Sequence, residues 1–212
     1  MGVAYTELDC NNMSNELIST IYDHYKDTCS NIAEAIKRRD RLMLFVILTL
    51  GFFAFQTIFP TVSNTVVNDF LNFKFGLTLK LNLAVIGNIV WFLLLIFTMR
   101  YFQVAVFVER QYAYIHQLEE KLNKVLGEEL ITREGKSYYH RYPIFSDWMW
   151  LLYTLIFPVL LLIIGVAKIT LELKDVVITG WSFGLILNTI AFLLLAISVT
   201  LYIVVIHKKS KQ

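Results

Sequence analysis

The chain has 212 residues, of which 57% are hydrophobic and 17% are charged, and its formal net charge is +2. Soluble domains are about 45–50% apolar and about 25% charged, so this composition excludes a disordered chain and argues against a soluble enzyme. The small net charge gives no sign of a nucleic-acid-binding surface over the whole chain. The two cysteines, Cys10 and Cys29, are too few for a disulfide framework and lack the spacing of a metal site.

Residues 1–41 come first in the chain and are predicted to form a cytoplasmic amphipathic helix. Apolar side chains such as Leu17, Ile21 and Ile32 recur there at helical spacing. A helix that only lies on a membrane surface is richer in Lys on its polar face. The pattern therefore favours packing against another cytoplasmic segment, with the membrane surface as the alternative.

Four long apolar runs follow this segment. Each has about 18–26 residues, which is enough to cross a hydrocarbon core of about 30 Å at about 1.5 Å per residue. No Asp, Glu, Lys, Arg or His lies inside any of them, a pattern typical of transmembrane helices. The predicted fold is an all-α membrane protein whose transmembrane helices are 42–59, 81–99, 148–167 and 181–206, paired as hairpins over 42–99 and 148–206.

The second transmembrane helix is predicted to continue far beyond the membrane. No helix-breaking residue occurs between Met99 and Gly127, and Ile115, Leu118 and Leu122 have coiled-coil spacing. Residues 100–147 are therefore predicted to be a long, mainly helical cytoplasmic segment. Its apolar stripe is expected to pack against the N-terminal helix and to contact neighbouring copies of the chain.

The two connections on the other side of the membrane are short. Residues 60–80 carry Val66, Phe70 and Phe73 and suit an interfacial helix, whereas residues 168–180 are too few to form a receptor domain. We therefore expect no large extracellular ligand, and we expect regulation to arrive from the cytoplasm.

The distribution of Lys and Arg predicts the orientation. Of the 19 Lys and Arg residues, 15 lie before the first predicted span, between the second and third, or after the fourth, and 4 lie in the other two connections. The positive-inside rule then places both termini and residues 100–147 in the cytoplasm, with residues 207–212 as a basic tail. The predicted location is the inner (plasma) membrane.

The predicted spans contain no catalytic or metal-binding motif, so the sequence predicts a protein that is not an enzyme and has no cofactor or metal. Glu109 and Arg110 lie about two turns beyond the second span. They form either a local salt pair or a ring of charge at a pore mouth. Pro158, midway along the third span, is expected to kink it.

Small, amide and hydroxyl side chains recur on one face of several spans. Such residues let helices approach closely and bond to one another, which is the favoured interpretation. The alternative is a weakly selective conduction path that closes by dewetting. The pore-lining candidates are Thr49, Gln56, Asn88, Thr98, Gly184, Asn188 and Ser198.

Basic side chains gather just before the first span and just after the fourth. They set the topology and contact anionic lipid, or alternatively bind an anionic ligand such as a nucleotide or a short nucleic acid. This group contains Lys37, Arg38, Arg39, Arg41, Lys208, Lys209 and Lys211.

Residues 114–129, which read YIHQLEEKLNKVLGEE, are similar to a Tyr-Ile-x-x-Leu-Glu-x-Lys-x-Asn pattern of small bacterial four-span proteins. The layout of the whole chain resembles membrane effectors of bacterial anti-phage defence operons, of the Hailong membrane effector type. The resemblance implies an oligomeric channel that a nucleotide-derived ligand holds shut and that opens on infection to depolarise the cell. It assigns no role to any single residue of this chain.

These observations favour a homo-oligomeric membrane channel or pore-forming effector that is gated from the cytoplasm. The alternative is a non-conducting membrane adaptor or assembly factor that recruits a cytoplasmic partner through residues 100–147. A small-solute transporter ranks lower, because the sequence shows no inverted repeat and no charge near the middle of the spans.

Overall fold

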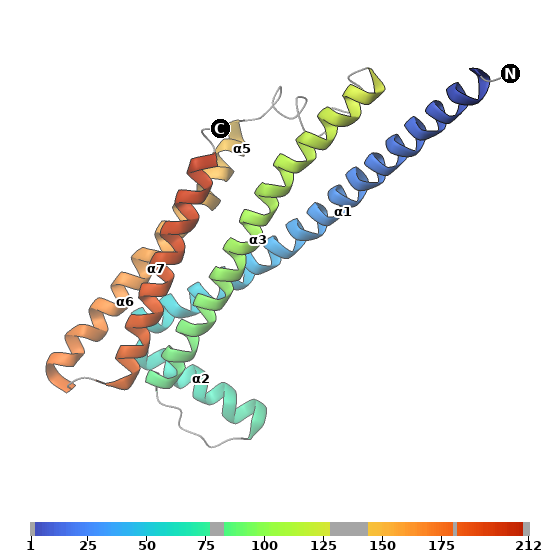
Figure 1. Ribbon diagram of the computed structural model, residues 1–212. Helices are drawn as coiled ribbons and strands as arrows, with labels where there is room; N and C mark the ends of the chain where they lie inside the picture. Colours follow the sequence, from blue (N-terminus) through green and yellow to red (C-terminus); the bar gives the residue numbers. More distant parts are fainter. Residues whose placement is uncertain (1–2, 77–82, 128–143, 180–181, 210–212) are drawn as a thin grey trace. The chain divides into compact units, whose positions relative to one another are not determined.

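The computed structural model describes residues 3–76, 83–127, 144–179 and 182–209, in which every regular element is a helix (Figure 1). Four of these helices are long and apolar enough to cross a membrane. The prediction of an all-α membrane protein with four membrane-spanning helices is confirmed at this level. Residues 128–143 of the predicted 100–147 segment and residues 210–212 of the basic tail lie outside the described residues.

The first half of the chain forms three helices. Helix α1 (Val3–Ile58) joins the predicted amphipathic segment and the first span into one uninterrupted helix. Helix α2 (Pro60–Phe75) follows at once, and helix α3 (Leu83–Leu126) contains the second span together with its predicted extension. Gly127 ends α3 at φ +73°, a left-handed conformation that glycine adopts without a steric penalty. The predicted end of this helix is therefore confirmed.

The second half of the chain contains a long helix with one wider turn. Helix α5 (Ile144–Leu151) passes into a π-helical turn, η1 (Leu152–Ile156), and then into helix α6 (Phe157–Thr179). Pro158 has no N–H to donate to the carbonyl four residues earlier, and the π-helical turn lies directly before it. The sequence predicted a kink at Pro158; the structure shows a π-helical turn that ends two residues before it. Helix α7 (Phe183–Lys209) completes the fold.

Helix α6 is longer than the sequence predicted. The third span was predicted to end at Ala167, but the helix continues to Thr179, and the helix identified as long and apolar enough to cross a membrane includes residues up to Lys174. Lys168 and Glu172 therefore lie within a spanning helix rather than in a loop. They form an ion pair one helical turn apart, and this pairing lowers the penalty for placing either charge in an apolar helix.

The chain divides into two compact units, which we describe separately. Unit 1 comprises residues 1–38 and 104–147, and unit 2 comprises residues 39–103 and 148–212. In unit 1 the apolar stripes of two segments are buried: that of the first part of α1 and that of the last part of α3. The buried side chains of this unit include Thr28, Ile32, Ala35, Val108, Ile115, Leu118 and Leu122.

In unit 2 helix α3 is the central helix. About 44% of its most apolar stretch is buried, against 28% for each of the other three spanning helices. The reason is that α3 contacts all three of them. Trp91 of α3 meets Phe53 of α1 in an edge-on ring contact with centroids 4.7 Å apart, and it also contacts Phe192 of α7. Tyr101 of α3 packs edge-on against Phe157 of α6.

The core of unit 2 is filled by large side chains. Phe102 of α3 stacks on Tyr202 of α7 with ring centroids 4.1 Å apart. Gly165 of α6 provides the space for Phe192, whose ring carbons lie 2.9 and 3.0 Å from the position that a Cβ atom would take. Between the aromatic contacts lie aliphatic side chains that are almost fully buried, namely Val46, Leu94, Leu161, Leu195 and Val199.

Candidate functional site

Polar side chains from all four spanning helices gather near one end of unit 2. This is the end at which α1 ends and α3 begins, and we call it the α2 end of unit 2. Helical geometry places all of these side chains within a few turns of their helix ends. We call the group the polar layer; it consists of Gln56 of α1, Asn88 of α3, Lys168 and Glu172 of α6, and Asn188 of α7.

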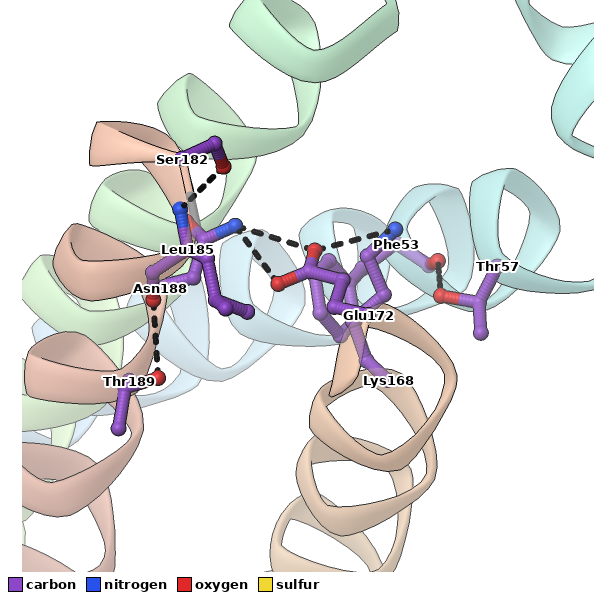
Figure 2. Close-up of polar contacts among 8 residues, drawn as sticks. All are labelled: Phe53, Thr57, Lys168, Glu172, Ser182, Leu185, Asn188 and Thr189. Carbon is purple, nitrogen blue, oxygen red and sulfur yellow. Dashed lines mark hydrogen bonds and ion pairs between the residues drawn. The ribbon is translucent and has the colours of Figure 1, made fainter. Parts of the chain in front are cut away.

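Asn188 and Glu172 form the strongest contact of the polar layer (Figure 2). The Nδ2 atom of Asn188 donates to both carboxylate oxygens of Glu172, each at 3.0 Å. The ammonium group of Lys168 lies 3.5 Å from Oε1 of Glu172. The two charged side chains are only 15% and 20% exposed, so their pairing is shielded from water more than a surface pair would be. The contact joins helix α6 to helix α7.

Two glycines bring the amides of the layer close to neighbouring backbones. A Cβ atom on Gly184 of α7 would lie 3.0 Å from Nδ2 of Asn88 on α3. A Cβ atom on Gly87 of α3 would lie 3.3 Å from Nε2 of Gln56 on α1. Small residues allow this close packing of helices, as the sequence analysis expected for such stripes. The polar layer is therefore a contact region between helices as well as a group of hydrogen-bonding side chains.

Several buried polar atoms of unit 2 have no hydrogen-bond partner among the described residues. They are Oδ1 of Asn188, Nε1 of Trp91 and Oγ1 of Thr98. An unpaired polar group in an apolar interior costs about 1–3 kcal/mol. These atoms therefore favour any rearrangement or ligand that would provide a partner.

The seven predicted pore-lining residues do not all lie together. Gln56, Asn88, Gly184 and Asn188 meet in or beside the polar layer. Thr98 is fully buried deeper in the core. Thr49 and Ser198 are partly exposed, and each hydroxyl donates to a carbonyl of its own helix, that of Phe45 or Leu194.

The charged candidates outside the polar layer lie on the long helices. Glu109 and Arg110 are both exposed on the part of α3 that belongs to unit 1. Of the basic group, Lys37, Arg38 and Arg41 are exposed on α1, and Arg39 pairs with its neighbour Asp40 at 2.9 Å. Lys208 and Lys209 lie in the last turn of α7, and Lys211 lies outside the described residues.

Unit 1 contains a buried carboxylate that the sequence analysis did not single out. Glu119 is only 4% exposed, and its Oε1 atom accepts a hydrogen bond of 3.1 Å from the hydroxyl of Tyr25. Burial, reinforced by the nearby Cys29 and Glu119, raises the pKa of the Tyr25 phenol above its ordinary value. In coiled coils a single buried polar residue can specify the register of the packed helices.

Lys168 and Glu172 are the functional candidates that the sequence analysis missed. Their spacing of four residues and the apolar residues between and after them, Ile169, Leu171 and Leu173, indicate a continuing helix. This signal was available in the sequence. Their link to Asn188 was not, because it depends on how α6 packs against α7.

No model of a protein family matches the chain, and comparisons with curated proteins and with solved structures found no match. Among the described residues, no group of three or more His, Cys, Asp or Glu side chains is arranged to hold a metal ion. What the fold and the site define is a class: an integral membrane protein with four spanning helices, a central helix α3 and a polar layer across all four helices.

Proposed function

We propose that the protein is a homo-oligomeric transmembrane channel or pore-forming effector that is gated from the cytoplasm. One observation carries the proposal: the polar layer with its Lys168–Glu172 pair is built around α3, the helix that continues into unit 1. Polar and charged side chains within otherwise apolar spanning helices are rare and commonly mark a functional site, here one that would control the path. The proposal assigns no catalytic chemistry and no cofactor to the chain.

The conduction path in this proposal lies between copies of the chain. The filled core of unit 2 supports this, because Phe53, Trp91 and Leu161 are fully buried beside the polar layer. A path between copies would be lined by partly exposed span residues that carry polar groups. Thr49 and Ser198 are the pore-lining candidates that meet this description.

Gating in this proposal acts along α3. A ligand that changes the packing of unit 1 would act on a helix that reaches the core of unit 2 without a break. The excess of basic residues supports a cytoplasmic position for unit 1 and both termini, in the inner membrane. The resemblance to anti-phage membrane effectors supports a cytoplasmic nucleotide or short nucleic acid as the regulator, and the basic group, including Arg38, Arg39 and Arg41, as its contact.

Ion flux through liposomes that contain the purified protein tests the proposal. We expect flux in at least one of two conditions, with nucleotide ligands or without them, and impermeability in both conditions would reject a channel. In a background with Cys10→Ser and Cys29→Ser, a charged thiol reagent should block Thr49→Cys and Ser198→Cys channels. Thr170→Cys is the matched control, because its hydroxyl also donates within its own helix, at an exposed position of α6.

A non-conducting adaptor is the second candidate, and one observation favours it. Tyr22, Phe107 and Tyr114 of unit 1 are 52%, 43% and 43% exposed, although most large apolar side chains outside a membrane are covered. If the protein is an adaptor, Phe107→Asp and Tyr114→Asp should release a cytoplasmic partner, and the unaltered protein should give no ion flux. A variant that keeps its partner and loses flux supports the channel instead.

A further inference from the structure

Helix α2 presents three different faces. The side with Ser63, Val67 and Leu71 is buried or half-buried, so other parts of the chain cover it. A second side is polar and exposed, and it carries Thr61, Thr65, Asp69 and Asn72. A third side is apolar and exposed, and it carries Val62, Val66, Phe70 and Phe73.

The apolar exposed side is a continuous stripe. At 3.6 residues per turn, its four residues fall within an arc of about 80°. Their exposed fractions are 53% for Val62, 52% for Val66, 56% for Phe70 and 88% for Phe73. A stripe of this kind is unfavourable in water, because burying large apolar side chains lowers the free energy of the protein. Something of matching chemistry must cover it.

The position of α2 in the chain indicates what covers the stripe. α2 begins at Pro60, two residues after the spanning helix α1 ends at Ile58, and its last residue lies eight residues before α3 begins (Figure 1). Both ends of α2 are therefore within a few residues of a helix that is long and apolar enough to cross a membrane. Ile58 and Phe59, which lead into α2, are themselves 66% and 54% exposed, so the apolar surface of the span runs directly onto the stripe.

We propose that α2 is a membrane-binding interfacial helix, whose Val62, Val66, Phe70 and Phe73 side chains contact lipid at the boundary between headgroups and acyl chains. The side with Thr65 and Asp69 then faces water, and the side with Val67 faces the protein. α2 carries one acidic and one basic side chain, Asp69 and Lys74, so it has no net charge. The contact therefore depends on apolar area and does not require anionic lipid.

The experiment is a nitroxide scan of residues 61–75 in the full-length Cys10→Ser, Cys29→Ser protein, reconstituted in phosphatidylcholine vesicles. Two reagents report the surroundings of each label. Molecular oxygen concentrates in the acyl region of the bilayer, whereas a nickel chelate stays in water. We expect the ratio of oxygen accessibility to nickel accessibility to be several-fold higher for labels at positions 70 and 73 than for labels at positions 65 and 72. Labels at 63 and 67 should be shielded from both reagents, which makes them the internal control for protein contact.

Three results would overturn the proposal. High nickel accessibility at 70 and 73 would place the stripe in water. Low accessibility to both reagents at these positions would show that a second copy or another protein segment covers it. A lipid signal that arises only when anionic lipid is added would show that charge, and not apolar area, holds the helix at the surface.

Discussion

The amide nitrogen of Asn188 lies 3.0 Å from both carboxylate oxygens of Glu172, and this contact joins α7 to the charged turn of α6. Asn188 is 4% exposed, so the bond forms away from water. The contact gives the Asn188 amide a specific partner within the spanning helices. It gives the Glu172 carboxylate a second donor besides Lys168. Loss of either side chain leaves the other with fewer partners in an apolar setting.

We expect Asn188→Leu to destabilise the protein in detergent by about 1–3 kcal/mol, because Glu172 loses two hydrogen bonds while Lys168 remains. The double variant Asn188→Leu, Glu172→Gln should be less stable still, because Lys168 then has no counter-charge. Thermal unfolding of the two variants and the unaltered chain measures this. Equal stability of Asn188→Leu and the unaltered chain would show that the contact has no energetic role.

Gly165→Ala should destabilise unit 2. A Cβ atom at this position would lie 2.9 Å from a ring carbon of Phe192 and 3.4 Å from Trp91, and both rings are packed in the core. Overpacking of this kind typically costs about 1–3 kcal/mol. Gly51→Ala is the matched control, because nothing lies within 4 Å of the corresponding Cβ position. Denaturation should give a lower unfolding midpoint for Gly165→Ala than for Gly51→Ala. Similar midpoints would contradict the close packing of Gly165 against Phe192.

Tyr25→Phe should weaken unit 1 by about 1 kcal/mol, because Glu119 loses the hydrogen bond from the phenol. Tyr22→Phe is the control, since Tyr22 is 52% exposed. Hydrogen exchange of the α1 and α3 amides in unit 1 measures the local effect. Slower or unchanged exchange in Tyr25→Phe would argue that the buried pair does not stabilise this packing.

The raised pKa of Tyr25 also predicts a dependence on pH. A folded-state pKa above the unfolded-state value means that the stabilisation is fully present below the ordinary phenol pKa of about 10 and is lost as the pH rises beyond it. Exchange in unit 1 should therefore accelerate above about pH 10 more in the unaltered chain than in Tyr25→Phe. Identical pH profiles for the two proteins would exclude a contribution of Tyr25.

The orientation is testable with an impermeant thiol reagent on intact cells, in the Cys10→Ser, Cys29→Ser background. Thr65→Cys on α2 should react, whereas Lys124→Cys, on the part of α3 that belongs to unit 1, should react only after the cells are opened. Both positions are exposed, so accessibility within the protein does not limit either reaction. The reverse pattern would contradict the positive-inside assignment.

The sequence by itself determined the class of fold. Apolar runs of sufficient length predicted all four spanning helices, and the unbroken stripe that ends at Gly127 predicted the extension of α3. These features are local, because backbone hydrogen bonding in lipid requires helices and a left-handed glycine ends one. The third span was predicted to end at Ala167, before Lys168, whereas helix α6 continues to Thr179 and contains the Lys168–Glu172 ion pair.

Only the tertiary structure decided which polar residues meet. Helical periodicity places Asn188 on a face of α7, but it does not say that Glu172 of α6 is opposite. It also groups Val67 with Phe70 on α2, although the chain covers the first and leaves the second exposed. The physical reason is that a sequence pattern defines the faces of one helix, whereas the neighbour of each face depends on how several helices pack together.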